Sequence, residues 1–400
     1  MFFHLYCRIY QFIFRTVACF LPWRKPKLIT GQGSIAMLPK QIKSCGIGSV
    51  LVITGHSVAS KGLLRPLYSG FQKEDIIYTV FDKTVPNPTI QNVEDALKVY
   101  RQNNCKGIVV IGGGSQMDCA KGVGARLVQP NKTIPQMKGV LKVLRKTPPI
   151  FAAPTTAGTG SETTIAAVIS NPETHEKYAV NDPVLIPEYA VLDPVLTAGL
   201  PPQLTATTGL DALTHAVEAY IGQSNTKETR TMSRKAVKLF FGNIENVYTD
   251  GSNLKARENM LMASYYAGIA FTRAYVGYVH AIAHALGGFY GTAHGLANAV
   301  ILPVVLEYYG KSVHKPLAEL ADLLGFSSNS DTNAQKAEKF ISAVKQLNIK
   351  MAIPKTFEYI RDADIPQMVD RAFKEANPLY PVPKILSRSD LFTIFHTIQG

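Results

Sequence analysis

Acidic residues are missing from the start of this 400-residue sequence, where the first carboxylate is Glu74. Cysteine is scarce as well: the five cysteines are an odd number and include no C-x-x-C pair, which excludes a disulfide framework and a zinc ribbon. The chain also lacks internal repeats and low-complexity tracts. We therefore expect reduced thiols in a cytoplasmic globular protein.

Positive charge is abundant but unevenly distributed. The formal net charge is +13, and ten Lys or Arg residues precede Glu74, so most of the excess lies in the N-terminal part. This distribution is typical of a basic N-terminal lobe and argues against an extended nucleic-acid groove. The length and the 46% hydrophobic content are sufficient for two hydrophobic cores.

Residues 1–23 form an apolar and aromatic N-terminal extension. Its polar side chains recur at helical spacing, which predicts an amphipathic helix with one polar face, made by His4, Arg8, Gln11 and Arg15. A transmembrane helix would bury two arginines at about 2.5–3.5 kcal/mol each near the bilayer centre, and no A-x-A-like cleavage site marks a secretory signal. Two interpretations stay open: peripheral contact with the anionic inner face of a membrane, or packing on the protein or a partner subunit.

The central and C-terminal parts of the chain differ in their hydrophobic periodicity. Between residues 48 and 200, short β-rich runs alternate with helical patterns, which predicts parallel strands joined by crossover helices. Beyond the pair Pro201-Pro202, helical periodicity continues without convincing strands. We expect an α/β domain over residues 24–200 and an all-α domain over residues 201–400.

Two glycine-rich loops in the α/β domain are candidate phosphate-binding segments. The first, residues 112–115, follows an apolar strand pattern and precedes a helical one. That order presents backbone N–H groups and a helix N-terminus to an anion, although consecutive glycines also suit a tight turn. The second loop, residues 154–162, offers hydroxyls and glycines. Two such loops in one domain favour a dinucleotide over a single phosphate.

Aspartate and histidine occur at metal-ligand spacing in the all-α domain. Asp211 and His215 are four residues apart in a helical segment and share one face, and His280 and His284 repeat this relation. His294 follows a glycine-rich stretch where the chain can turn back. Imidazole and carboxylate together suit Fe²⁺, Zn²⁺, Co²⁺ or Ni²⁺ better than Mg²⁺ or Ca²⁺. Such a metal, with one open position, can lower the pKa of an alcohol so that the alkoxide releases hydride.

These motifs resemble those of the iron-containing (group III) alcohol dehydrogenase family, from about Lys25 to the C-terminus; the most specific segments are 211–218 and 277–295. The resemblance implies a Rossmann-like N-terminal domain, a helical metal-binding domain and a homodimer. It also implies His284 as a catalytic residue near the substrate and the nicotinamide. The implied metal ligands are Asp211, His215, His280 and His294. Histidine as the fourth ligand favours Fe²⁺, with Zn²⁺ as the alternative used by glycerol dehydrogenase relatives.

The resemblance assigns coenzyme contacts to both loops and to further positions. After the first strand, NAD-preferring relatives often carry an Asp that accepts from the ribose 2′-OH, whereas this sequence has Gly55, followed closely by Ser57. Without that carboxylate, and with hydroxyl and cationic donors nearby, we expect NADP to be favoured over NAD. The expected coenzyme-binding residues are Gly55, Ser57, Asn87, Gly112, Gly113, Gly114, Ser115, Asp118, Thr155, Thr156, Thr159 and Lys177.

The expected activity is that of a metal-dependent, NAD(P)-linked alcohol dehydrogenase or aldehyde reductase acting on a small primary alcohol or its aldehyde. Two alternatives are a glycerol dehydrogenase-like polyol oxidoreductase and a dehydroquinate synthase-like lyase. The lyase needs several cations around its site, and Arg273 is the nearest candidate in a stretch dominated by Ala, Gly, Leu, Tyr and Val. A silent membrane-surface scaffold would retain buried Asp and His at a cost, and a metal hydrolase would leave the glycine loops without a role.

Overall fold

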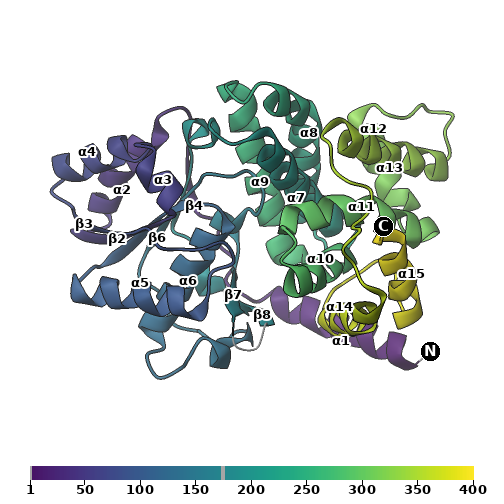
Figure 1. Cartoon of the computed structure of the whole chain (residues 1–400), viewed down its shortest axis with the longest axis horizontal. Helices are drawn as coiled ribbons and strands as arrows, with labels where there is room; N and C mark the ends of the chain where they lie inside the picture. The colour runs from purple at the N-terminus through teal and green to yellow at the C-terminus, as the bar shows by residue number, and fades with distance from the viewer. Residues whose placement is uncertain (1, 173–175) are drawn as a thin grey trace. The chain divides into compact units, whose positions relative to one another are not determined.

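The computed structural model describes residues 2–172 and 176–400. Met1 and residues 173–175, which belong to the predicted extension and the predicted α/β domain, lie outside the described residues. The chain forms two compact units (Figure 1). One unit comprises residues 22–200 and 250–265, and the other comprises residues 1–21, 201–249 and 266–400.

A six-stranded parallel sheet forms the centre of the first unit. In spatial order the strands are β1 (Lys27–Thr30), β9 (Tyr189–Leu192), β6 (Ile150–Pro154), β4 (Gly107–Gly112), β2 (Ser49–Thr54) and β3 (Ile77–Phe81). Three neighbouring strands, β2, β4 and β6, lie in the middle, so their carboxyl ends meet at one edge of the sheet. This edge is where α/β sheets bind their ligands.

Helices cover both faces of this sheet (Figure 1). Alternate residues of β2 enter two different cores: Val50 and Val52 pack with α2 (Leu38–Ser44) and α4 (Arg65–Lys73), whereas Leu51 and Ile53 pack with α5 (Ile90–Gln102) and α6 (Gly114–Val128). Continuous apolar strands are what burial on both faces requires. The remaining elements of this unit are α3 (His56–Ser60) and a small sheet of β5 (Gly139–Val140), β8 (Glu176–Asn181) and β7 (Ala166–Asn171).

The second unit is built from helices, and between residues 201 and 400, all of which the structure describes, no named strand occurs. The α/β plus all-α organisation predicted from periodicity is confirmed. Its helices are α7 (Pro202–Ile221), α8 (Lys227–Thr249), α9 (Leu254–Ala274, which begins in the first unit), α10 (Tyr278–Tyr290), α11 (His294–Tyr309), α12 (His314–Leu324), α13 (Asn333–Lys350), α14 (Ile365–Ala376) and α15 (Arg388–Ile398). Short 3-10 helices are η1 (Ser34–Met37), η2 (Pro135–Met137), η3 (Ser161–Thr163), η4 (Pro183–Leu185), η5 (Pro194–Thr197), η6 (Gly310–Ser312) and η7 (Asp362–Asp364).

The N-terminal helix α1 (Phe2–Ala18) packs on the second unit, beside α14 (Figure 1). The expected amphipathic helix is present, but its polar face is the one that contacts the protein. Gln11 is buried, and Arg8 donates to backbone carbonyls near the C-terminus. Among the described residues, no helix has the length and apolar character needed to cross a membrane.

Candidate active site

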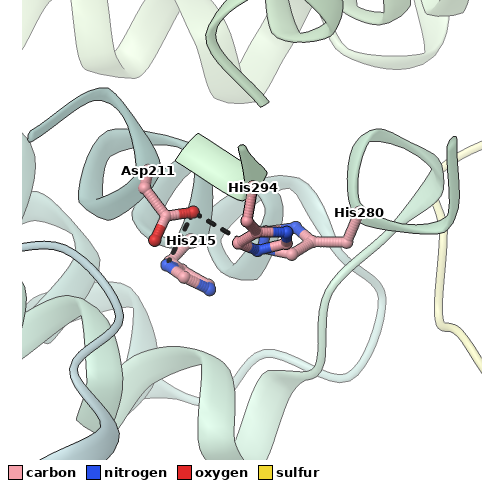
Figure 2. Close-up of side chains that lie close together, drawn as sticks. All are labelled: Asp211, His215, His280 and His294. Atoms are coloured by element: carbon pink, nitrogen blue, oxygen red, sulfur yellow. Dashed lines mark ion pairs between the residues drawn. The ribbon is translucent and has the colours of Figure 1, made fainter. Parts of the chain in front are cut away.

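Four side chains with metal-ligating atoms lie together in the helical unit: Asp211, His215, His280 and His294 (Figure 2). One such atom from each residue lies within 4.8 Å of the others. Asp211 Oδ1 is 3.9 Å from His215 Nδ1 and 3.5 Å from His294 Nε2. The first three residues are buried and His294 is half-buried, which leaves one side of the cluster accessible. The structure therefore brings together all four ligands expected from the sequence.

Local sequence explains why three helices converge here. Asp211 and His215 are one turn apart on α7. Gly291, with φ of +67°, ends α10, and α11 begins three residues later at His294. A Cβ on Gly295 would lie 2.4 Å from the carbonyl oxygen of Thr207, so only glycine permits this approach of α11 to α7. The close approach puts His294 beside Asp211.

Glu218 fixes the orientation of His280. Its carboxylate lies 2.6 Å from His280 Nδ1 and accepts from the backbone N–H groups of Gly277 and Val279, each at 2.9 Å. Burial raises the pKa of Glu218 to about 7, and the backbone hydrogen bonds oppose that rise. Burial also lowers the pKa of His280 well below its ordinary value. A neutral imidazole that donates Nδ1–H to Glu218 has its lone pair on Nε2, the atom that faces the cluster.

Asn298 contacts three of the four candidate ligand residues through its amide nitrogen. Its Nδ2 lies 2.7 Å from Asp211 Oδ1, 3.3 Å from His280 Nε2 and 3.2 Å from His294 Nε2. These three ligand atoms therefore lie around one common point. Because the set consists of one carboxylate and three imidazoles, its chemistry fits a borderline divalent ion such as Fe²⁺ or Zn²⁺.

His284 lies next to this cluster but has its own partners. Its ring centroid is 5.1 Å from that of His294 and 6.0 Å from that of His280. Nδ1 of His284 is 2.6 Å from Glu375 Oε1, which also accepts a hydrogen bond from the Tyr380 hydroxyl at 2.8 Å. The His284 side chain is 30% exposed, against 3% for His280. A histidine with a carboxylate on one nitrogen and solvent access is suited to proton transfer.

The two glycine-rich loops lie at the carboxyl ends of adjacent strands in the α/β unit. The first follows β4 and the second follows β6, and Thr155 N–H donates to the carbonyl of Gly112 at 3.0 Å. A Cβ on Gly114 would lie 2.7 Å from Thr159 Cγ2, and one on Gly113 would lie 3.3 Å from Thr156 Oγ1. A side chain at Gly114 would thus overlap Thr159, and one at Gly113 would crowd Thr156, so the glycines permit the close contact between the loops. Gly55 and Ser57 lie at the end of β2, the next strand along the sheet.

Further predicted coenzyme residues are connected to the first loop. The backbone N–H of Asn87, a residue with φ of +55°, donates to Ser115 Oγ at 3.1 Å, and Lys177 Nζ donates to Asn87 Oδ1 at 2.9 Å. Asp118 accepts from Ser161 Oγ at 3.1 Å. Residues that are distant in sequence thereby meet around the N-terminus of α6.

Lys121 is a buried residue to which the sequence motifs assign no role. Its ammonium group donates to Ser161 Oγ, to Thr164 Oγ1 and to the carbonyls of Thr164 and Ala166, all within 3.0 Å. Burial lowers the pKa of Lys121 to about 8, while the nearby Asp118 opposes the shift. The pKa of Asp118 is raised by burial to about 6 and is lowered in turn by Lys121. Lys121 therefore ties α6 to the segment that follows the second loop.

Three other residues at the metal cluster received no role from the sequence. Glu218 is seven residues after Asp211 and Asn298 is four after His294, so helical spacing puts each on its ligand's face and could have identified both. Glu375 is 91 residues from His284, and no local pattern connects them.

Comparison with known proteins agrees with this geometry. A family model described as iron-containing alcohol dehydrogenase matches residues 25–194, and one described as Fe-containing alcohol dehydrogenase family, C-terminal, matches residues 205–399. The chain therefore belongs to the iron-containing alcohol dehydrogenase family, and it is a metal-dependent oxidoreductase of the alcohol dehydrogenase and aldehyde reductase class.

Individual relatives align over most of their length. The chain is 37% identical over 369 residues to a 1,3-propanediol dehydrogenase of Klebsiella pneumoniae, covering 91% of this chain and 95% of the relative. It is 38% identical over 350 residues to alcohol dehydrogenase 4 of Saccharomyces cerevisiae, covering 86% and 90%. The solved structure of an alcohol dehydrogenase from Oenococcus oeni superposes with a TM-score of 0.91 at 32% identity, over 94% of this chain and all of that one.

Proposed function

We propose that this enzyme interconverts a small primary alcohol and its aldehyde, with hydride exchanged at nicotinamide C4 and a metal held by Asp211, His215, His280 and His294. The observation that carries the proposal is the convergence of these four ligand atoms within 4.8 Å. Fe²⁺ is the favoured ion and Zn²⁺ the alternative. When bound, the metal supplies a Lewis acid to the substrate oxygen.

We expect proton transfer to and from the substrate to use His284 and the residues that hold it. Nδ1 of His284 lies 2.6 Å from Glu375 Oε1, and we expect Nε2 to exchange a proton with the substrate. Tyr380 holds Glu375 in turn. We expect His284→Ala to lower kcat while the purified protein keeps its full metal content by elemental analysis. Loss of the metal in that variant would mean that the ligands are misassigned.

A small, uncharged alcohol as the substrate is supported by the chain and by its relatives. The helices that carry the ligands are rich in buried Ala, Val, Leu and Ile, which offer few groups for a highly charged substrate. One relative is a 1,3-propanediol dehydrogenase. A short alcohol with a primary hydroxyl fits both observations.

The first assay uses anaerobically purified protein reloaded with Fe²⁺ or with Zn²⁺. It follows oxidation of NADPH or NADH in the presence of short and medium aldehydes, with the metal-free protein as the control. Metal-dependent oxidation with an aldehyde is the expected result. If no aldehyde causes oxidation of NADPH or NADH although metal and dinucleotide are both bound, the proposal is contradicted and lyase chemistry is favoured.

We also propose that the twelve residues expected at the coenzyme bind a dinucleotide, with NADP preferred. Gly55 carries no charge, and Ser57 follows it in α3. Asp82, after the neighbouring β3, is engaged by His56 Nδ1 at 3.3 Å.

An aspartate at position 55 would repel a 2′-phosphate, so Gly55→Asp should shift the ratio of kcat/KM values toward NAD by about tenfold or more. Gly48→Asp, at an exposed glycine before β2 with open space around it, is the matched control. Equal kcat/KM values for NAD and NADP in the unmodified enzyme would refute the preference.

The domain roles and the assembly follow from the same proposal. Residues 24–200 would bind the coenzyme and residues 201–400 the metal, with residues 1–23 as an extension. We infer a homodimer on family resemblance, and sedimentation velocity at several protein concentrations tests it: a monomer at all concentrations would refute it.

A further inference from the structure

The helix α1 is attached to the protein through hydrogen bonds made by its polar face. Arg8 donates to the carbonyls of Val382 and Pro383, at 2.8 and 3.1 Å. The Gln11 amide donates to the carbonyls of Pro378 and Tyr380, at 3.1 and 2.8 Å. Buried Cys7 and the stacking of Phe3 on Phe373 complete the contact. These are specific bonds to backbone groups, and they fix which side of α1 faces outward.

The outward side of α1 is apolar apart from Thr16. Large side chains recur there at helical spacing and are half to four-fifths exposed: Phe2 84%, Leu5 58%, Tyr6 54%, Ile9 51%, Phe12 70%, Ile13 55% and Val17 49%. An amphipathic helix on a water-soluble surface ordinarily turns this side inward. A continuous exposed stripe of this kind marks a surface that binds something apolar.

The size of the stripe argues against a second copy of the chain as its occupant. A helix of 17 residues is about 25 Å long, and half of its lateral surface is roughly 500 Å². A standard protein interface buries about 800 Å² on each partner. A lipid surface has no such minimum, because an interfacial helix binds by inserting its apolar side chains about 5–10 Å into the bilayer.

Charge points to an anionic surface. α1 carries two cations and no carboxylate: Arg8 is bound to the protein, and Arg15 is exposed while one of its nitrogens donates to the carbonyl of Gln223 at 3.2 Å. Two copies of α1 side by side would bring the two Arg15 side chains together without an acidic partner on either helix. An anionic headgroup layer attracts Arg15, at about 1 kcal/mol for each Lys or Arg near the surface.

We propose that α1 is a membrane-surface helix, anchored to the enzyme by Arg8 and Gln11 and inserting its outward apolar face into an anionic bilayer. The protein would be peripheral, since only one face of one helix enters the lipid. This proposal is independent of the catalytic function.

The test is co-flotation of the full-length protein with vesicles of phosphatidylglycerol and phosphatidylcholine, against vesicles of phosphatidylcholine alone. We expect the protein to float with the anionic vesicles and to bind the neutral ones about fivefold more weakly. The double variant Phe12→Gln with Ile13→Gln should reduce binding at least tenfold, because both side chains point outward and glutamine keeps the helix. Ile349→Gln is the matched control: Ile349 is 58% exposed on α13, against 55% for Ile13, and its variant should float like the unmodified protein.

Three outcomes overturn the proposal. Failure of the unmodified protein to float would exclude lipid binding, and an equal loss in Ile349→Gln would show that the effect is not specific to α1. A smaller sedimentation coefficient of the double variant without lipid would instead identify a second copy as the occupant. Coenzyme and metal binding of the double variant, measured in parallel, distinguish loss of docking from loss of the fold.

Discussion

The candidate metal cluster and the two glycine-rich loops are assembled by different kinds of contact. In the helical unit, Asp211 and the three histidines are held by other side chains, notably Glu218 and Asn298. In the α/β unit, the loops approach each other closely because glycines lack a side chain: a Cβ at Gly114 would collide with Thr159. One site depends on which functional groups are present, and the other depends on how closely two backbone segments approach.

This difference determines how each site should respond to mutation. A side-chain site loses its ligand when one donor atom changes, even if the shape of the residue is preserved. A backbone site tolerates changes of chemistry but not of volume. The predictions below test this contrast, beginning with the largest effect.

The largest effect is expected from Asp211→Asn. The amide has the shape of the carboxylate but lacks its charge, so the metal loses its only anionic ligand in the cluster and activity should fall below detection. Elemental analysis of the purified variant measures the loss. Asp193→Asn is the control: Asp193 is equally buried but caps η5 in the other unit, where asparagine keeps the N-cap bond from Val195 and loses the bond from Ile35, so metal content should not change. A variant at 211 that retains full metal content would contradict the ligand assignment.

Glu218→Gln should have the next largest effect. Glutamine can keep one of the two backbone hydrogen bonds but no longer holds His280 as a carboxylate does, so metal affinity should fall about 10–100-fold. Competition with a chelator measures the affinity. Glu375→Gln makes the parallel change on His284 and should lower kcat while leaving the affinity for metal as it was. Equal effects of the two variants on metal affinity would remove the distinction between His280 and His284.

Gly114→Ala tests the backbone side of the contrast. The added methyl group would lie 2.7 Å from Thr159 Cγ2, and relief of that overlap costs about 1–3 kcal/mol. Borne by the coenzyme-binding conformation, this cost raises the KM for the coenzyme by about 5- to 150-fold. Thr159→Ser removes Cγ2 and retains the hydroxyl, so the double variant should recover most of the loss. If the double variant is as impaired as Gly114→Ala, the contact between the loops is not the cause.

The same contrast explains how much the sequence could predict. Helical periodicity predicts the all-α character of residues 201–400, and i,i+4 spacing selects Asp211 with His215. The loops were found as motifs, but the contact of Gly114 with Thr159 depends on β4 and β6 being neighbours, which local patterns do not encode. Glu375 and Lys121 were missed for the same reason, because their partners are tens of residues away.

The N-terminal helix illustrates a different limit. Its polar and apolar faces were evident from the spacing of Arg8, Gln11 and their neighbours. Which face contacts the protein depends on free carbonyl groups at 378–383, and these exist only once that segment has left α14. Periodicity defines the faces of a helix, whereas the partner surface decides which face it receives.

The smallest effect compares two glycines that lie outside both sites, one inside a helix and one at a helix end. Gly242 is exposed within α8, and an added Cβ would meet nothing within 4 Å. Gly242→Ala should therefore stabilise the protein by about 0.5–1 kcal/mol, because alanine loses less backbone entropy in a helix, and activity should not change. Gly325→Ala has the same open surroundings but φ of +71° at the end of α12, so it should destabilise. Thermal unfolding of both variants measures the difference; a shift of the same sign in both would mean that backbone conformation does not set the role of these glycines.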